Sequence, residues 1–417
     1  MTSHHAPSEW IDSRFALRRL LATLAIMALG NGAMYVVSVV LPSVQTEFGI
    51  SRADAAMPYT LLMLGFGVGG IFMGKVADRF GVLPTLVWGG LATGVGYVLA
   101  ARAEGMWSFS LAHGLILGLM GCAVTFAPLM ADTAQWWNRR RGVAVAVCAS
   151  GNYLAGAFWP PVIQWGIANW GWRDTYTALG LICGGGMLLL SLMFRLRPPL
   201  AAEVVKPSSA ASSAPATAWV SETPLGMNRV RALFLLSVAG VACCVAMSMP
   251  QVHIVAYCTD LGFGPARGAE MLSLMLACGI VSRLVSGHIC DRIGGLRTLL
   301  LGSVLQGTAL LLFLPFEGLA SLYLASALFG LFQGGIVPSY AIIVREYFPA
   351  VRAGVQTGTV IMATLLGMAL GGWMSGAIFD LTGSYKAAFV NGIAWNLLNL
   401  SIALYFYRRA RGMGQLR

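Results

Sequence analysis

One arginine, Arg283, stands within an apolar segment that we place at about residues 268–290. A guanidinium near the centre of a bilayer costs at least ~2.5 kcal/mol on insertion scales, and it persists where it faces a cavity and meets an anion. Its planar fork of donors matches a carboxylate bidentately. The alternative is an arginine that snorkels or bonds the backbone, which is strained here because the stem would have to cover about two helical turns. We therefore predict that Arg283 contacts a carboxylate.

Polar or aromatic residues within other apolar segments complete the candidate binding site. Each of the polar ones alone is more often a helix–helix hydrogen bond than a ligand. His253 and Tyr257 lie near the end of their segment and are candidates for a gate or a proton relay, with an interfacial histidine and tyrosine as the alternative. The remaining candidates for substrate contact are Gln333, Asn31, Tyr35, Thr125, Phe126 and Asn152.

No acidic residue lies deep within an apolar segment, so a carboxylate proton relay is poorly supported. Asp132 and Asp380 fall at segment ends, and Glu270 begins one. Two coupling schemes stay open. Protons could enter with the substrate, carried by its own acid group or by His253. Alternatively, anions could be exchanged, because an unpaired Arg283 in an empty cavity would resist a conformational switch.

A short charged motif occurs twice, 213 residues apart: GKVADRFG at 74–81 and GHICDRIG at 287–294. Four positions are identical, including Asp78 with Asp291 and Arg79 with Arg292. Further landmarks correspond in the same order, which predicts an internal duplication. These pairs are EFGISRADA (47–55) with DLGFGPARGA (260–269), WWNRRRG (136–142) with EYFPAVRAG (346–354), and GWRDTY (171–176) with SYKAAF (384–389).

The elements that must position these residues are membrane-spanning helices. The chain is 57% hydrophobic and 10% charged, whereas about a quarter of a soluble domain is charged. A span needs about 20 apolar residues, and twelve segments qualify, so we predict an all-α membrane protein. They are roughly 18–41, 55–74, 83–101, 108–131, 142–168, 174–194, 229–257, 268–290, 297–315, 320–344, 354–380 and 387–407.

The positive charges assign the two sides of the membrane. Alternate loops on one side hold five of the 27 Lys and Arg residues, and Arg283 lies within a span. The other 21 lie in the remaining loops and the two ends of the chain. The positive-inside rule then places both termini in the cytoplasm of a multi-pass protein of the cell (inner) membrane. Because topology explains the net charge of +11, we expect no nucleic-acid partner.

The chain divides into two six-helix halves, residues 1–194 and 229–417. The intervening 195–228 is rich in Pro, Ser and Ala, which is typical of a flexible cytoplasmic linker. The 51 glycines lie mostly within spans and favour close helix packing within a monomer in lipid over a dimer interface. No metal cluster, nucleophile elbow or phosphate loop occurs in the sequence, so we expect neither enzymatic activity nor a cofactor.

The G-x-x-x-D-R-x-G motif between the second and third helix of each half resembles the signature loop of the major facilitator superfamily. This resemblance implies two pseudo-symmetric six-helix bundles that work by alternating access. It also implies gating roles for Asp78, Arg79, Asp291 and Arg292, which would latch neighbouring helices when the outward-facing state forms. The alternative is that these residues only fix the topology.

Three segments resemble the monocarboxylate transporter and oxalate–formate antiporter group: WWNRRRGVAVAVCASGN (136–152), HIVAYCTDLGF (253–263) and SRLVSGHICDRIG (282–294). The resemblance implies that Arg283 binds substrate carboxylate and ranks Gln333 next. The animal members have an acidic-Gly-Gly-aromatic pattern where this chain has GNGAMY (30–35), and an aspartate at the position of Gly279. These departures put the coupling ion and the substrate in doubt. Since no Lys, Arg or His lies between Arg352 and Lys386, one fixed cation favours a monocarboxylate. The alternative is an exporter of drugs or other solutes.

Overall fold

The computed structural model describes residues 10–197, 224–349 and 353–415. Within these ranges the protein is built from helices and contains no β-strand. Twelve helical segments of the described chain are long and apolar enough to cross a membrane, which confirms the predicted all-α class. The predicted linker, 195–228, lies largely outside the described residues.

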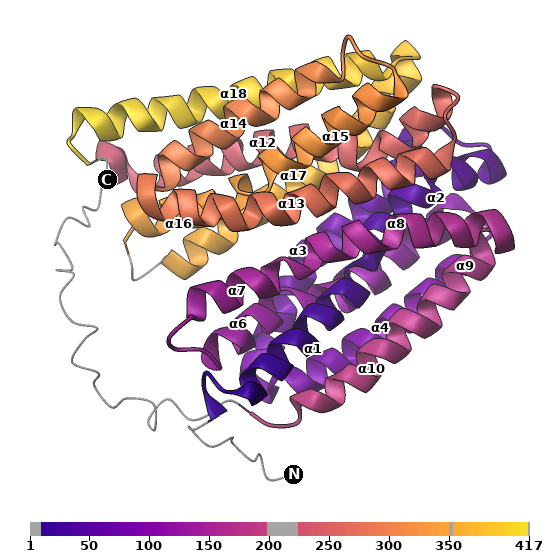
Figure 1. Ribbon diagram of the computed structural model, residues 1–417, viewed down its shortest axis with the longest axis horizontal. Helices are drawn as coiled ribbons and strands as arrows, with labels where there is room; N and C mark the ends of the chain where they lie inside the picture. Colours follow the sequence, from indigo (N-terminus) through magenta and orange to yellow (C-terminus); the bar gives the residue numbers. More distant parts are fainter. Residues whose placement is uncertain (1–9, 198–223, 350–352, 416–417) are drawn as a thin grey trace.

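The first six spans form one bundle, drawn from indigo to magenta in Figure 1. Four of them are composite, because the α-helix breaks within the span or gives way to a π-helix or a 3-10 turn. Their elements are α1 (Arg14–Gly30), α2 (Gly32–Phe48), α3 (Arg52–Phe80), α4 (Val82–Ala101), α5 (Met106–Leu111), the π-helix η2 (Ala112–Gly121), the 3-10 turn η3 (Cys122–Thr125), α6 (Ala127–Gln135), α7 (Arg141–Ala149), α8 (Gly151–Trp170), α9 (Trp172–Leu179), the π-helix η4 (Gly180–Gly184), α10 (Gly185–Ser191) and the 3-10 turn η5 (Leu192–Phe194).

The last six spans form the second bundle, which is more regular. A short 3-10 turn, η6 (Pro224–Gly226), precedes it. One span, α15–α16, is broken at Gly334 and Gly335. The elements are α12 (Arg229–Asp260), α13 (Pro265–Ile293), α14 (Gly295–Leu312), α15 (Leu319–Gln333), α16 (Ile336–Tyr347), α17 (Ala353–Thr382) and α18 (Tyr385–Gly412).

Backbone conformation repeats between the halves at the landmarks found in the sequence. Gly81 and Gly294, which end the two copies of the charged motif, have φ of 89° and 83°. Gly49 and Gly262, which end the first span of each half, have φ of 60° and 84°. A positive φ strains residues with a Cβ, so the same helix ends are shaped by glycine in both halves.

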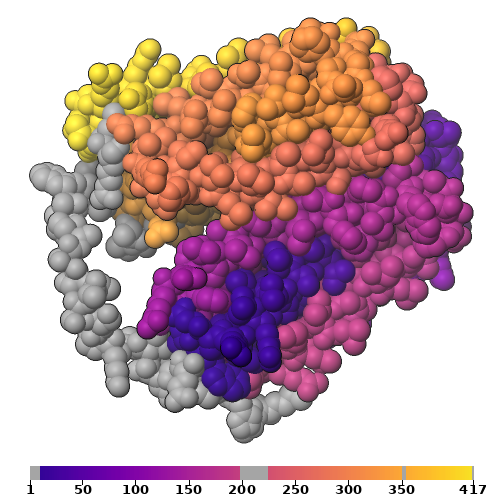
Figure 2. Space-filling model, viewed as in Figure 1, coloured from indigo at the N-terminus to yellow at the C-terminus, as the bar shows by residue number. Residues whose placement is uncertain are grey.

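The bundles meet closely at one face and separate at the other. We call the face formed by residues 80–82, 136–140 and 293–295 the basic face, and the face formed by 49–51, 102–105, 313–318 and 383–384 the opposite face. Figure 2 shows the two bundles diverging toward the left, where the basic face lies. The protein therefore has an open and a closed end.

The buried apolar core follows the same division. One cluster joins both halves, with Tyr35 and Tyr59 from the first and Val252 and Leu276 from the second. Toward the basic face the core splits into one cluster within each half. Packing thus holds the halves together only over the closed part of the molecule.

Glycines on the helices that face the other half report this separation directly. A Cβ at Gly376 of α17 would lie 2.8 Å from the Arg52 carbonyl oxygen of α3, and one at Gly67 of α3 would lie 2.7 Å from the Met362 sulfur. By contrast, no described atom outside the glycine's own stretch of helix lies within 4 Å of a Cβ placed at several glycines nearer the basic face. These are Gly74, Gly142, Gly287, Gly354 and Gly358.

Candidate functional site

Arg283 lies on α13 and contacts the first half of the molecule. Its Nη1 donates to the carbonyl oxygen of Ala149 on α7, 2.9 Å away. The guanidinium carbon stands 4.5 Å from the ring centroid of Tyr153 on α8. Its Nε is buried and has no hydrogen-bond partner among the described residues. Arg283 therefore reaches across the interface between the two halves, which we call the seam. Its Nη1 donates to a backbone carbonyl, whereas its Nε is unused.

A helix break supplies the carbonyl that Arg283 contacts. The fifth span is interrupted between α7 and α8 at Ser150, whose N–H bonds back to the carbonyl of Ala146. Gly151 follows, and a Cβ there would lie 2.6 Å from the Met27 side chain of α1. Close packing against α1 thus selects glycine beside the break, and the Ala149 carbonyl at the end of α7 accepts from the other half.

Gly279, one helical turn before Arg283, makes room for the aromatic neighbour of the guanidinium. A Cβ at Gly279 would lie 2.6 Å from Cε1 of Tyr153. The absence of an acidic side chain here, noted as a departure in the sequence, therefore has a steric basis. The cation contacts an aromatic face, which contributes about 0.5–2 kcal/mol, rather than an anion.

Tyr35 and Asn152 extend the group around Arg283. The Tyr35 hydroxyl donates to Oδ1 of Asn152, 3.2 Å away, and Asn152 adjoins Tyr153 in sequence. Tyr35 also packs against α8, since a Cβ at Gly156 would lie 2.7 Å from its Cζ. We call Arg283, Tyr153, Asn152 and Tyr35 the Arg283 cluster.

Gln333 lies beside this cluster but faces a different helix. Gln333 ends α15, and the next residue, Gly334, packs tightly on α13. A Cβ at Gly334 would lie 2.8 Å from the backbone nitrogen of Arg283. Oε1 of Gln333 accepts from Nε2 of Gln251 on α12, 3.1 Å away. The Gln333 Nε2 is buried without a partner in the described chain, so a donor is left over here as well.

Asn31, Thr125 and Phe126 lie inside the first bundle. Thr125 Oγ1 lies 3.1 Å from Oδ1 of Asn31 and 2.6 Å from the Cys122 carbonyl, and either oxygen can accept its single proton. Phe126 packs edge-on against Phe66 at 6.2 Å. These side-chain contacts all lie within the first bundle, and no hydrogen bond connects this group to the Arg283 cluster among the described residues.

The opposite face is closed by a group that sequence analysis had not assembled. Arg52, the first residue of α3, donates from Nη1 to Asp260 of α12 (3.1 Å) and to the Tyr385 hydroxyl of α18 (2.9 Å). Its guanidinium lies 4.6 Å from the Phe379 ring centroid. Asp380 of α17 accepts from the backbone N–H groups of Arg52 and Ala53, both at 2.8 Å. A single residue of the first half thus engages three helices of the second.

His253 continues this chain of hydrogen bonds inward. Its Nε2 lies 2.8 Å from the Gly372 carbonyl, which can only accept, so Nε2 carries a proton. Its Nδ1 lies 3.2 Å from the Tyr385 hydroxyl, which accepts from Arg52 and so has its own proton to donate. We call Arg52, Asp260, Asp380, Tyr385 and His253 the closure cluster. Tyr257 packs on Tyr385 with centroids 5.4 Å apart, and its hydroxyl is buried without a described partner.

The comparisons with known proteins now decide the family. A model of the Major Facilitator Superfamily matches residues 21–321 and 259–416. The chain belongs to the major facilitator superfamily. Its members are membrane transporters, so this chain is a transporter of a small molecule and not an enzyme.

Curated relatives within the superfamily agree with the group resemblance found in the sequence. Monocarboxylate transporter 13 of Bos taurus is 29% identical over 317 residues, which cover 76% of this chain and 71% of the relative. Monocarboxylate transporter 11 of Mus musculus is 27% identical over 382 residues, 88% of this chain and 82% of the relative. Among solved structures, a peptide transporter POT in complex with sulfate has a TM-score of 0.72 at 14% identity and covers 96% of both chains. That structural likeness supports the fold.

The superfamily's signature loops lie at the open end of the molecule. Asp78, Arg79, Asp291 and Arg292 are all exposed. The guanidinium of Arg79 lies over the neighbouring Phe80 ring, and none of the four forms an ion pair with a described residue. In this conformation the two loops therefore do not latch one half to the other.

A buried ion pair of this superfamily member was missed in the sequence. Arg19 of α1 donates from Nε and Nη2 to both carboxylate oxygens of Asp132 on α6, at 2.9 and 2.8 Å. The Arg19 and Asp132 side chains are only 3% and 2% exposed, so Arg19 is more deeply buried than Arg283. The signal was present, because Asp132 was recognised at a span end, but sequence alone does not show which cation faces it.

Proposed function

We propose that this transporter carries a small organic anion, most favourably a monocarboxylate, across the membrane by alternating access. The observation that carries the proposal is the unpaired, buried Nε of Arg283 at the seam between the halves. A buried guanidinium donor without a partner is best satisfied by an anion, because a charge-assisted hydrogen bond is about twice as strong as a neutral one. The names of the curated relatives support the same class of substrate.

We propose that the carboxylate replaces the Ala149 carbonyl as a partner of Arg283. The carbonyl contact is a single neutral acceptor at 2.9 Å, whereas a carboxylate offers a charged, bidentate one. Asn152 and Tyr35 stand next to the guanidinium as further polar contacts, and the free Nε2 of Gln333 lies on the adjoining helix. Asn31, Thr125 and Phe126 remain more distant candidates that a conformational change would have to bring closer.

Replacing that carbonyl gives a route from binding to movement. The Arg283–Ala149 hydrogen bond joins the two halves. An anion that takes over the guanidinium would release α7 from α13. Both schemes contain this step. Anion exchange requires that only the loaded carrier switch, whereas proton symport also requires that the empty carrier return. His253 and Tyr257 stay candidates for a proton relay.

We further propose an orientation and a division of roles. The protein would lie in the cell (inner) membrane with its basic face toward the cytoplasm, so the conformation described above would open inward. The closure cluster then forms the outer gate, while Asp78, Arg79, Asp291 and Arg292 form the inner one in the alternate state. The halves would be residues 1–194 and 229–417, joined by 195–228, and the transporter would work as a monomer.

Uptake into proteoliposomes tests the proposal. Radiolabelled lactate, pyruvate, oxalate and an aromatic acid are compared with and without a pH gradient. We expect a monocarboxylate to be taken up, and we expect Arg283→Ala to lower its uptake by about a hundredfold, as for loss of a buried charged partner. Arg408→Ala, an exposed arginine of α18, is the matched control and should leave uptake unchanged.

Two results would overturn the proposal. Full uptake by Arg283→Ala would show that this guanidinium does not bind the substrate. Uptake of an organic cation, with no carboxylate moved by the wild type, would instead identify an exporter of drugs or other solutes. Stimulation by an inward proton gradient would separate symport from exchange, which requires a loaded anion on the far side.

A further inference from the structure

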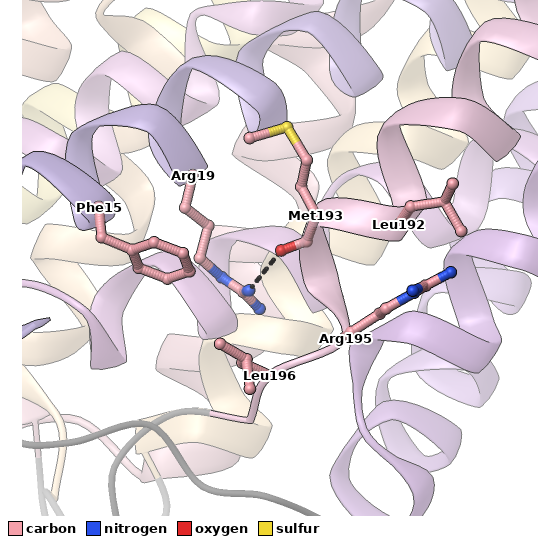
Figure 3. A pocket seen from close by; sticks show the side chains of 6 residues that line it. All are labelled: Phe15, Arg19, Leu192, Met193, Arg195 and Leu196. Atoms are coloured by element: carbon pink, nitrogen blue, oxygen red, sulfur yellow. Dashed lines mark hydrogen bonds between the residues drawn. The ribbon is translucent and has the colours of Figure 1, made fainter.

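A pocket on the outside of the first bundle has no role in the transport scheme. It lies near the basic face between α1 and η5, at the beginning and end of the bundle, and has a volume of about 390 Å³. That volume is within the range of about 300–1,000 Å³ typical of small-ligand pockets. Figure 3 shows Phe15, Arg19, Leu192, Met193 and Leu196 around it, with Arg195 directed outward from its edge.

The corresponding place in the second bundle is filled. There the lead-in turn η6 inserts Leu225 and Met227 beside α12 and α18, where they are 1% and 4% exposed and belong to the apolar core. Nη2 of Arg409 holds the turn by donating to the Gly226 carbonyl, 3.3 Å away. The junction between the first and last helix of this half is therefore plugged by the chain itself.

In the first bundle the lead-in runs elsewhere. Trp10 stacks on Phe15 with centroids 4.5 Å apart, and the Asp12 N–H donates to the Trp136 carbonyl. These contacts lie toward the end of α6 rather than the gap beside η5. Among the described residues, the first bundle thus has the same junction without an apolar plug, and exposed apolar walls favour an apolar occupant.

The surroundings of the pocket show where that occupant comes from. Leu17, Leu21, Leu189 and Leu192, on the two helical segments that flank the pocket, are between 47% and 71% exposed. In a membrane-spanning protein such a surface faces lipid, so the pocket opens onto the acyl chains of the surrounding bilayer.

The charges at the rim favour an anionic headgroup. Arg14, Arg18 and Arg195 are exposed and form no ion pair or hydrogen bond within the described residues. Arg19, by contrast, is already neutralised by Asp132. We propose that this pocket binds one anionic phospholipid of the leaflet at the basic face, with an acyl chain in the place that Leu225 and Met227 occupy in the second half and the phosphate near Arg18 and Arg195.

Native mass spectrometry of the purified full chain tests this site. Phosphatidylglycerol and phosphatidylcholine with identical acyl chains are titrated against the wild type. We expect the wild type to retain phosphatidylglycerol in preference to phosphatidylcholine. Arg18→Gln with Arg195→Gln should lower that preference by about thirtyfold, because each arginine near an anionic surface contributes about 1 kcal/mol. The control, Arg408→Gln with Arg411→Gln, removes two exposed arginines from the other bundle and should not change it.

A second variant tests the acyl-chain part without changing charge. Leu192→Trp places a larger side chain at the mouth of the pocket and should displace one bound phosphatidylglycerol. Inorganic phosphate, which lacks acyl chains, should not compete. Equal binding of both lipids by wild type, competition by phosphate, or unchanged binding by Leu192→Trp would each overturn the proposal and leave the pocket to water or another part of the chain. Because lipid is counted directly, none of these outcomes depends on which substrate is transported.

Discussion

The opposite face and the basic face of this transporter are held by different kinds of contact. At the opposite face, Arg52 of the first half engages Asp260 and Tyr385 of the second, and Asp380 accepts from the start of α3. At the basic face, the strongest contact is the Arg19–Asp132 pair, which lies entirely within the first half. Polar contacts therefore join the halves at one end and stabilise a single half at the other.

The two kinds of contact should therefore have different effects: one on the folding stability of a half, and the other on which end of the transporter is open. A buried pair within one half should be needed in every state of the cycle, because the half moves as a body. Contacts between halves must form and break in each cycle, so their strength has to remain modest. Exposure agrees with this distinction: the Asp260 side chain is 35% exposed, whereas that of Asp132 is 2% exposed.

The largest effect should follow from Asp132→Asn. Because the variant leaves Arg19 charged and buried, we expect the free energy of unfolding to fall by about 3 kcal/mol. Denaturation in detergent, followed by circular dichroism, measures this change. Asp174→Asn, at an exposed aspartate of the same half, is the control. If both variants were equally stable, the pair would not stabilise the half.

Arg52→Gln should shift the conformation rather than unfold the protein. The variant loses the ion pair and cation–π contact across the seam, and we expect opening of the opposite face to increase about thirtyfold. Thr60→Cys is a suitable reporter for maleimide labelling, because the Thr60 hydroxyl donates to the Ala369 carbonyl across the seam. Arg173→Gln removes an ion pair with Glu47 inside the first half and should leave labelling unchanged. A similar increase in both variants would contradict the distinction.

Tyr385→Phe should have a smaller effect of the same kind. It keeps the Arg52–Asp260 pair and removes only the hydroxyl between Arg52 and His253. One hydrogen bond contributes about 1 kcal/mol net, so labelling at position 60 should rise about fivefold. Labelling as fast as in Arg52→Gln would mean that the phenol, and not the ion pair, holds this face closed.

The smallest effect should come from Asp78→Asn or Asp291→Asn. Neither aspartate has an ion-pair partner in the described chain, so stability in the present conformation should not change. If each latches the basic face in the alternate state, transport should slow about threefold, as expected for exposed charge pairs. Uptake rates measured beside melting temperatures distinguish this result. A lowered melting temperature with normal uptake would assign these residues to topology.

Helices were predictable from the sequence because the bilayer imposes a length and a composition on each of them. The predicted span 229–257 became α12, Arg229–Asp260, and 174–194 became Trp172–Phe194. The breaks within spans were not predicted. The break at Ser150, for instance, lies beside Gly151, which packs against Met27 of a different helix.

The site was predictable only where one residue violated the composition of its surroundings. Arg283 stood out as a charge in an apolar segment, whereas Arg52 and Asp260 looked like ordinary charges at helix ends. Their importance depends on four helix ends meeting at one point, those of α3, α12, α17 and α18, which no local pattern encodes. Gln333 and Asn31 were recognised as polar, but their partners, Gln251 and Thr125, came from distant segments.

The first N–H groups of α3 are divided between two acceptors, one on its own turn and one on the other half. Ser51 accepts from Asp54 within the same turn, 3.1 Å away, and Asp380 reaches the N–H groups of Arg52 and Ala53 from the other half. When α17 moves away, Asp380 leaves with it, but Ser51 remains and the first turn keeps a cap. The contacts of the closure cluster can therefore break and re-form without fraying the first turn of α3.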